Sequence, residues 1–221
     1  TKFKQYRVKD DLHQRLLAFT TDPYIHQQSL EYLNVPSQWT QRKEHLSQLL
    51  FFRILTLLGH TMNYPDYENT HTDWVLNLTV LVQDKTAGRL HGLQYMVALH
   101  KSNGSIDGKH QVIPYRQGDN HVYLIFVLEQ AWKKADFQGS ADDFLKLVDR
   151  SSLRGAFCFR EADLIATGHI ATETQPGKTE LYLPVPKADG TFDDSLPRTH
   201  EFSAHYFHHT EFEHMVETMM R

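Results

Sequence analysis

The spacing of apolar residues changes near residue 60, and this change constrains the fold more than any other feature of the chain. Before it, apolar residues recur at helical spacing, and a predicted helix is apolar on nearly every side from Leu46 to Leu58. A helix of that kind has to be buried on most of its faces. From Trp74 onward, apolar and polar residues alternate, which is typical of half-buried strands. The sequence therefore predicts helices followed by a sheet.

Short turns connect the predicted strands. Four strands are expected between residues 73 and 128, separated by turns that contain Gly88, Gly104 with Gly108, and residues 117–120. Short connections favour antiparallel neighbours, so this segment is predicted to be a four-stranded meander. Further strands are expected at 154–160, 164–172, 179–185 and 201–208.

The remaining segments complete an α+β fold: N-terminal helices packed on a curved, mainly antiparallel sheet, with a helix at the C-terminus. We predict one domain, 1–221, because no repeat and no Gly- or Ser-rich linker divides the chain. Its parts are a helical region 1–60, the meander 73–128, helices within 129–150, further strands within 153–209, and a helix at 210–221. Thr210 and Glu213 are expected to form the capping box of that last helix.

The composition excludes some kinds of site. The chain has 15 histidines but one cysteine, which rules out an intramolecular disulfide framework and a multi-cysteine zinc site. Its formal net charge of -4 argues against a nucleic-acid partner, and mild acidification should carry the charge through zero. We expect a cytoplasmic protein without a membrane segment. No zincin motif, nucleophile elbow or phosphate-binding glycine loop is present, so the sequence identifies no cofactor, metal or catalytic residue.

The segment 60–73 contains the highest density of polar functional groups. It connects the predicted buried helix to the first strand, and loops held by rigid elements often carry binding residues. We expect it to lie at one rim of the sheet, near the Gly88 turn or the 117–120 turn. Arg53, within the apolar helix, should pair with a carboxylate or reach a ligand anion. The candidate ligand-binding residues are His60, Tyr64, Asp66, Tyr67, Glu68, His71, Asp73 and Arg53; a solvated loop and a structural ion pair remain the alternatives.

Three hypotheses about function follow from these features. The first is a non-catalytic domain that binds a small molecule or a protein partner. The second is an enzyme that uses His and carboxylate acid-base chemistry, or metal-assisted hydrolysis, at the 60–73 loop. The third is a transcriptional regulator with a degenerate helix-turn-helix at 29–46, for which few cations are available. The sequence leaves the oligomeric state open.

Overall fold

Strands dominate the part of the chain that the structure describes. The computed structural model describes residues 54, 62–63, 72–77, 79–87, 89–106, 109–130, 153–196 and 198–221. A six-stranded sheet has the order β1-β2-β3-β8-β9-β11. Its strands are β1 (Met62–Asn63), β2 (Trp74–Leu76), β3 (Val80–Ala87), β8 (Val122–Leu128), β9 (Leu153–Arg160) and β11 (Tyr206–His208).

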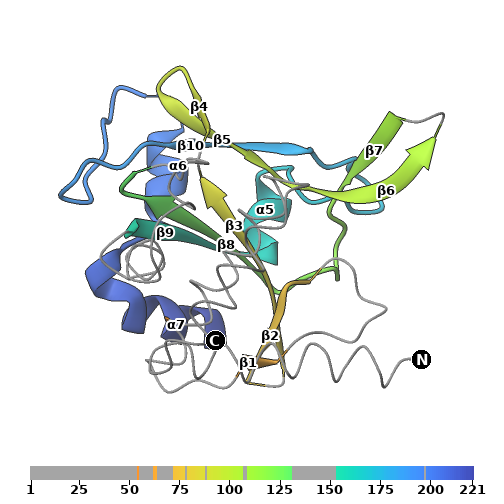
Figure 1. The fold of residues 1–221 in the computed structure, drawn as a ribbon, viewed down its shortest axis with the longest axis horizontal. Coiled ribbons are helices and arrows are strands. Elements are labelled where there is room, and N and C mark those ends of the chain that lie inside the picture. Colours follow the sequence, from red (N-terminus) through yellow and green to blue (C-terminus); the bar gives the residue numbers. More distant parts are fainter. Residues whose placement is uncertain are drawn as a thin grey trace, which may run out of the picture.

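The remaining strands form two smaller sheets. One has the order β10-β5-β4, from β10 (Glu180–Pro184), β5 (Gln94–Ala98) and β4 (Arg89–His91). The other is a two-stranded ribbon of β6 (His100–Ile106) and β7 (Lys109–Pro114). In Figure 1 this ribbon extends away from the six-stranded sheet. Three helices occur in the described part: α5 (Glu161–Ala166), α6 (Thr199–Ser203) and α7 (Phe212–Met220).

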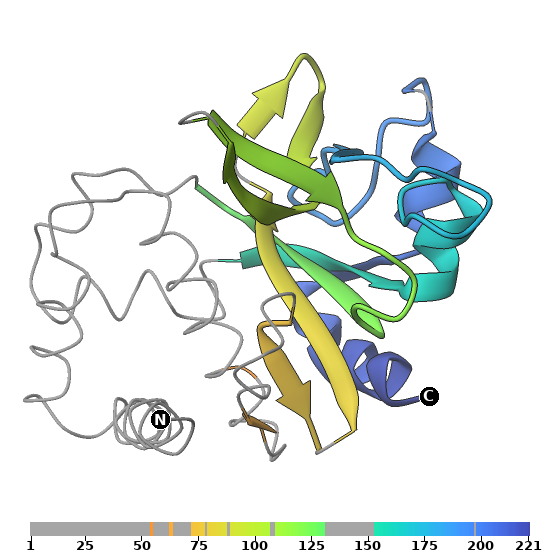
Figure 2. The ribbon, with the colours of Figure 1, turned by 90° about the vertical axis from the view of Figure 1, so that its right-hand side faces the viewer.

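The central strand, β8, is buried at all seven positions, so it carries core side chains on both faces. One face meets α7, where the Phe126 and Phe212 rings lie 6.5 Å apart between centroids. The other face packs against β5, β10, α5 and α6 in a single apolar cluster. Figures 1 and 2 show the three-stranded sheet and α7 on opposite sides of β8 and β9. The core therefore has two layers, one on each side of the main sheet.

The predicted fold class is wrong. The described chain is mostly strand, and only α7 among its helices is longer than seven residues. The predicted N-terminal helices lie outside the described residues except for Ile54, which is helical and buried, and of the helices expected within 129–150 the structure describes only residues 129 and 130, which form a bend.

The predicted meander is also wrong, although antiparallel pairs predominate as expected. β3 pairs in parallel with β8, with Val82 opposite Val122. The strands between them do not join this sheet, since β4 pairs with β5 and β6 pairs with β7. The short connections do form antiparallel hairpins, but these hairpins are not part of the six-stranded sheet.

Two strands predicted near the C-terminus, 164–172 and 201–208, begin as helices instead. Residues 161–166 form α5, because Asp163 accepts a hydrogen bond from the backbone of Arg160 (2.8 Å) and Gly168 adopts a positive φ of 77° just after the helix. Residues 199–203 form α6, leaving only β11 from the predicted strand 201–208.

The C-terminal helix is present and buries the predicted stripe of Phe212, Met215, Val216 and Met219. Its predicted capping box does not form. Glu211 instead accepts a hydrogen bond from the backbone of His208 (2.9 Å), which precedes the short 3-10 turn His209–Glu211.

We expect His169 to make the stability of the core depend on pH. Its side chain is buried beside Phe202, and its pKa is lowered to about 4, chiefly by burial and further by Lys178 and Arg198, while Glu201 opposes them. Between pH 6.5 and about 4 the unfolded chain binds more protons at this histidine than the folded chain does, so stability falls as pH falls.

We expect the free energy of unfolding of His169→Gln to fall less on acidification than that of the wild type. Urea denaturation at several pH values measures this difference. An NMR titration of the wild-type imidazole near its usual pKa would contradict the expectation.

Candidate functional site

The hairpin of β2 and β3 places a carboxylate beside a carboxamide. Trp74 is opposite Val82, and the Asp73 backbone N–H donates to the Val82 carbonyl (3.0 Å), so Asp73 lies next to Gln83. The Asp73 Oδ2 atom accepts hydrogen bonds from Gln83 Nε2 and from the Asp84 backbone N–H, the latter at 3.0 Å. Two strands therefore fix the position of this carboxylate.

Lys85 extends the same row of polar groups. Gln83 and Lys85 are two residues apart on β3, so both side chains leave the same face of the sheet. Gln83 is buried, whereas Lys85 is half-buried with its Nζ atom 5.7 Å from the centroid of the Tyr115 ring. We call Asp73, Gln83 and Lys85 the polar strip. The polar strip lies at the edge of a sheet face whose other side chains belong to the apolar core.

Asp84 is on the opposite face and has a different role. Its carboxylate accepts a hydrogen bond from the indole Nε1 of Trp74 (2.8 Å), and both side chains are buried. This bond joins β2 to β3 on the face away from Lys85. The hydrogen bond supports the hairpin that positions the polar strip, because a buried carboxylate requires such partners.

Tyr123 supplies a hydroxyl next to the strip. It is the parallel neighbour of Gln83 on β8, and its ring packs edge-on against Tyr115 with centroids 5.3 Å apart. The hydroxyl is buried and has no hydrogen-bond partner within the described part of the chain. Burial raises the pKa of Tyr123 well above its usual range, so the group is a neutral donor.

A loop at residues 116–121 connects the strip to the ribbon. The Thr72 hydroxyl lies 2.7 Å from Asn120 Oδ1 and 3.1 Å from the Asp119 carbonyl. The Asp119 carboxylate accepts from Lys101 Nζ on β6 (2.6 Å) and from the Arg116 backbone (2.7 Å). Thr72 immediately precedes Asp73, so the base of the ribbon is bonded to the residue next to the strip.

The same loop is also held by α5. The Gly118 backbone N–H donates to Glu161 Oε1 (2.6 Å). Burial raises the pKa of Glu161, an effect that the Gly118 hydrogen bond opposes. The loop is therefore fixed by contacts with β6, with α5 and with the segment that precedes β2.

The structure describes one of the eight residues predicted to bind a ligand. Asp73 belongs to the polar strip, and its neighbour Thr72 contacts the 117–120 turn, near which the 60–73 loop was expected. The other seven lie outside the described residues: Arg53, His60, Tyr64, Asp66, Tyr67, Glu68 and His71.

Gln83 and Lys85 were missed by the sequence analysis. They belong to three consecutive polar residues, 83–85, that follow an apolar stretch within one strand. This run of polar residues within a strand was the sequence feature that could have indicated the site. The alternation of the strand accounts for Gln83 as part of a polar face, and it does not single out Lys85.

In the described ranges, no group of three or more His, Cys, Asp or Glu side chains is placed to hold a metal ion. No helix in those ranges combines the length and apolar character needed to cross a membrane.

Comparison with known proteins gives a similarity of fold. No family model matches the chain, and no curated protein matches its sequence. The bacterial homing endonuclease I-Ssp6803I has a similar structure, with a TM-score of 0.50, 13% sequence identity, and coverage of 83% of this chain and 98% of that one. The crystal structure of MepB is a weaker match, with a TM-score of 0.41, 15% identity, and coverage of 71% and 95%. The fold of this chain is therefore similar to that of a homing endonuclease.

Proposed function

We propose that this protein is a metal-dependent phosphodiesterase that cleaves nucleic acid, with the polar strip at its reaction centre. The observation that carries the proposal is the alignment of Asp73, Gln83 and Lys85 on one face of the β2–β3 hairpin. A carboxylate, a carboxamide and an ammonium group in one row suit a negatively charged substrate that is brought in with a cation. The fold similarity to a homing endonuclease supports phosphodiester chemistry over other hydrolytic reactions.

The donor set fits a divalent cation such as Mg²⁺. Mg²⁺ prefers oxygen ligands and is usually held by one or two carboxylates together with water and substrate phosphates. The Asp73 carboxylate and the amide oxygen of Gln83 would supply protein ligands, and a phosphate would complete the set. The cation would supply charge stabilisation for the phosphoryl oxygens during hydrolysis.

The side chains of the strip and its neighbour have distinct roles in this proposal. In hydrolysis, a water oxygen bonds to phosphorus and the water loses a proton, while the ester P–O bond breaks and the departing oxygen takes its electron pair and, in exchange with solvent, a proton. The Lys85 ammonium group is positioned to stabilise negative charge on the phosphate. The Tyr123 hydroxyl beside the same row is neutral and fully buried, so it supports the strip from within the core and does not contact the substrate.

This proposal develops the second hypothesis, metal-assisted hydrolysis at the 60–73 loop, since Asp73 ends that loop. It replaces the non-catalytic domain as the favoured function. A net charge of -4 describes the whole chain, whereas a phosphate encounters local charge, so the total does not exclude nucleic acid as a partner.

The proposal is tested by DNA cleavage with Mg²⁺ or with a chelator, using wild-type protein, Lys85→Ala and Lys187→Ala purified in parallel. Lys187 is an exposed lysine outside the strip, so it is a matched control for loss of charge. We expect cleavage only with Mg²⁺, a decrease of about 100-fold or more in Lys85→Ala, and no change in the control. Equal cleavage by all three proteins would indicate a contaminant and contradict the proposal, as would no cleavage by the wild type.

A further inference from the structure

We infer that the β6–β7 ribbon docks in the major groove of duplex DNA and sets the position of the duplex over the polar strip. This inference rests on the proposed function and names its substrate as double-stranded DNA. The major groove of B-DNA admits a two-stranded β-ribbon. In Figure 1 the ribbon extends beyond the two packed layers, so it is an element that a groove can accommodate.

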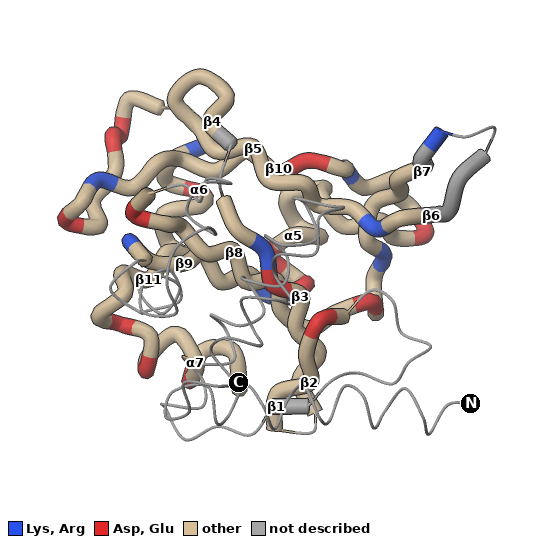
Figure 3. Tube along the Cα trace, viewed as in Figure 1, with Lys and Arg blue, Asp and Glu red and all other residues tan. Residues whose placement is uncertain are grey.

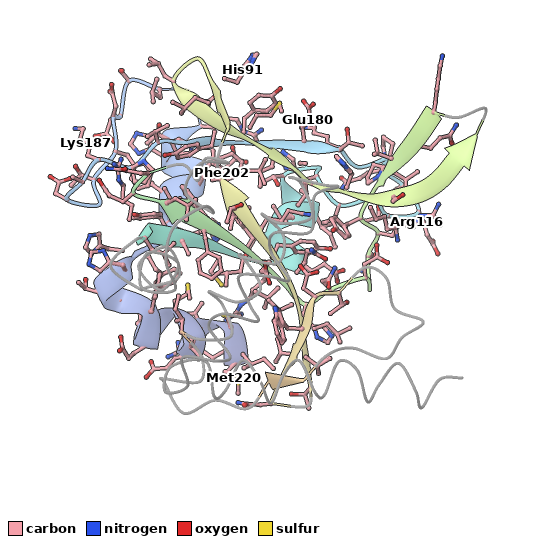
Figure 4. All side chains as sticks on the ribbon, in the orientation of Figure 1. His91, Arg116, Glu180, Lys187, Phe202 and Met220 are labelled. Atoms are coloured by element: carbon pink, nitrogen blue, oxygen red, sulfur yellow. The ribbon has the colours of Figure 1, made fainter. Side chains whose placement is uncertain are left out.

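The charge of the ribbon suits a polyanion. Residues 100–116 contain Lys101, Lys109 and Arg116 but only one acidic residue, Asp107, in a chain whose acidic residues outnumber its Lys and Arg overall. Lys109 and Arg116 are exposed. Figure 3 colours the described parts of both ribbon strands blue or tan, and Figure 4 labels Arg116 beside the ribbon. Because Lys101 is paired with Asp119, the exposed cations are Lys109 on the ribbon and Arg116 at its base, on an otherwise acidic protein.

One face of β7 can also contact bases. Lys109 and Gln111 are both exposed and are two residues apart on the strand, so they leave the same face of the ribbon. A glutamine can make paired hydrogen bonds to adenine in the major groove. Val112 is 42% exposed on the opposite face and takes no part in this contact.

The base of the ribbon is fixed relative to the reaction centre. Lys101 is buried and bonds Asp119 at 2.6 Å, and the carbonyl of Asp119 accepts from the hydroxyl of Thr72, the residue before Asp73. These hydrogen bonds connect the ribbon to the strip, so the two are not separated by a flexible linker. Binding of DNA at the ribbon can therefore orient a phosphate at the strip. A cleft of about 620 Å³ lies below the ribbon between Ile113, Arg116 and Pro176.

The test measures binding of a duplex of about 20 base pairs, two helical turns, by fluorescence anisotropy in EDTA so that no cleavage occurs. Lys109→Glu is compared with wild-type protein and with Lys187→Glu, an equal change of charge at a distant turn (Figure 4). We expect Lys109→Glu to weaken duplex binding about tenfold or more and to reduce the slope of log Kd against log salt. The control should bind within about twofold of the wild type, as an exposed residue outside a contact does.

The outcomes separate this inference from the proposed function. If Lys109→Glu binds the duplex as tightly as the wild type while Lys85→Ala still loses cleavage, the ribbon assignment is wrong and the reaction centre stands. If Lys109→Glu loses binding but the wild type never cleaves, the ribbon stands and the catalytic proposal fails. Equal affinity of the wild type for single and double strands, or no measurable duplex binding, also overturns the inference.

Discussion

Asp73→Asn is expected to lower the rate of DNA cleavage by about 1,000-fold, at the upper end of what one charge-stabilising group contributes. The substitution keeps the shape of the side chain and an oxygen that can still accept from the Asp84 backbone, so the β2–β3 hairpin should be retained. It removes the negative charge that a divalent cation requires. Single-turnover kinetics with excess enzyme, at several Mg²⁺ concentrations, separate a loss of metal affinity from a loss of chemistry.

The matched control for this prediction is Asp194→Asn, at an exposed aspartate outside the strip. It makes the same change of charge and should leave the rate unaltered. Full activity of Asp73→Asn at saturating Mg²⁺ would remove Asp73 from the reaction centre.

Phe157→Ala is expected to lower the free energy of unfolding by about 3–5 kcal/mol, the usual cost of removing a buried aromatic ring. Phe157 is fully buried at the centre of β9, and its ring contacts those of Phe159, Phe192 and Tyr206. These rings pack the main sheet against the segments that cover it. Removal of the Phe157 ring would therefore leave a cavity between these parts of the chain.

Urea denaturation followed by tryptophan fluorescence measures this effect. Leu93→Ala removes an apolar side chain that is 68% exposed at the β4–β5 turn, and it should change stability by no more than about 0.5 kcal/mol. Similar losses in the two variants would show that Phe157 is not a central core residue.

Local patterns in the sequence predicted local structure well. β9, β10 and the buried stripe of α7 were found because each depends on the periodicity of one short segment. The parallel pairing of β3 with β8 could not be found in this way, because it depends on where the intervening hairpins pack. At 164–170 a few alternating apolar residues resembled a strand, while the helix depended on the Asp163 cap and on Gly168.

Of the candidate site, only Asp73 was predicted from the sequence. Polar density in the loop led to Asp73, but Gln83 and Lys85 were concealed in a strand whose alternation appeared to explain them. Their proximity to Asp73 follows from the register of Trp74 with Val82, and a single sequence does not specify register.

The parallel pairing of β3 and β8 has a consequence for how the chain acquires its structure. These neighbours are separated by residues 88–121, so a long loop must close before their hydrogen bonds form. The β4–β5 and β6–β7 hairpins involve only local contacts and can form on a timescale of about 1–10 μs. Joining β3 to β8 is therefore expected to be a late and slow event in refolding. Until that step the β2–β3 hairpin that carries the polar strip would lack the support of β8, so recovery of catalysis should lag behind recovery of strand content.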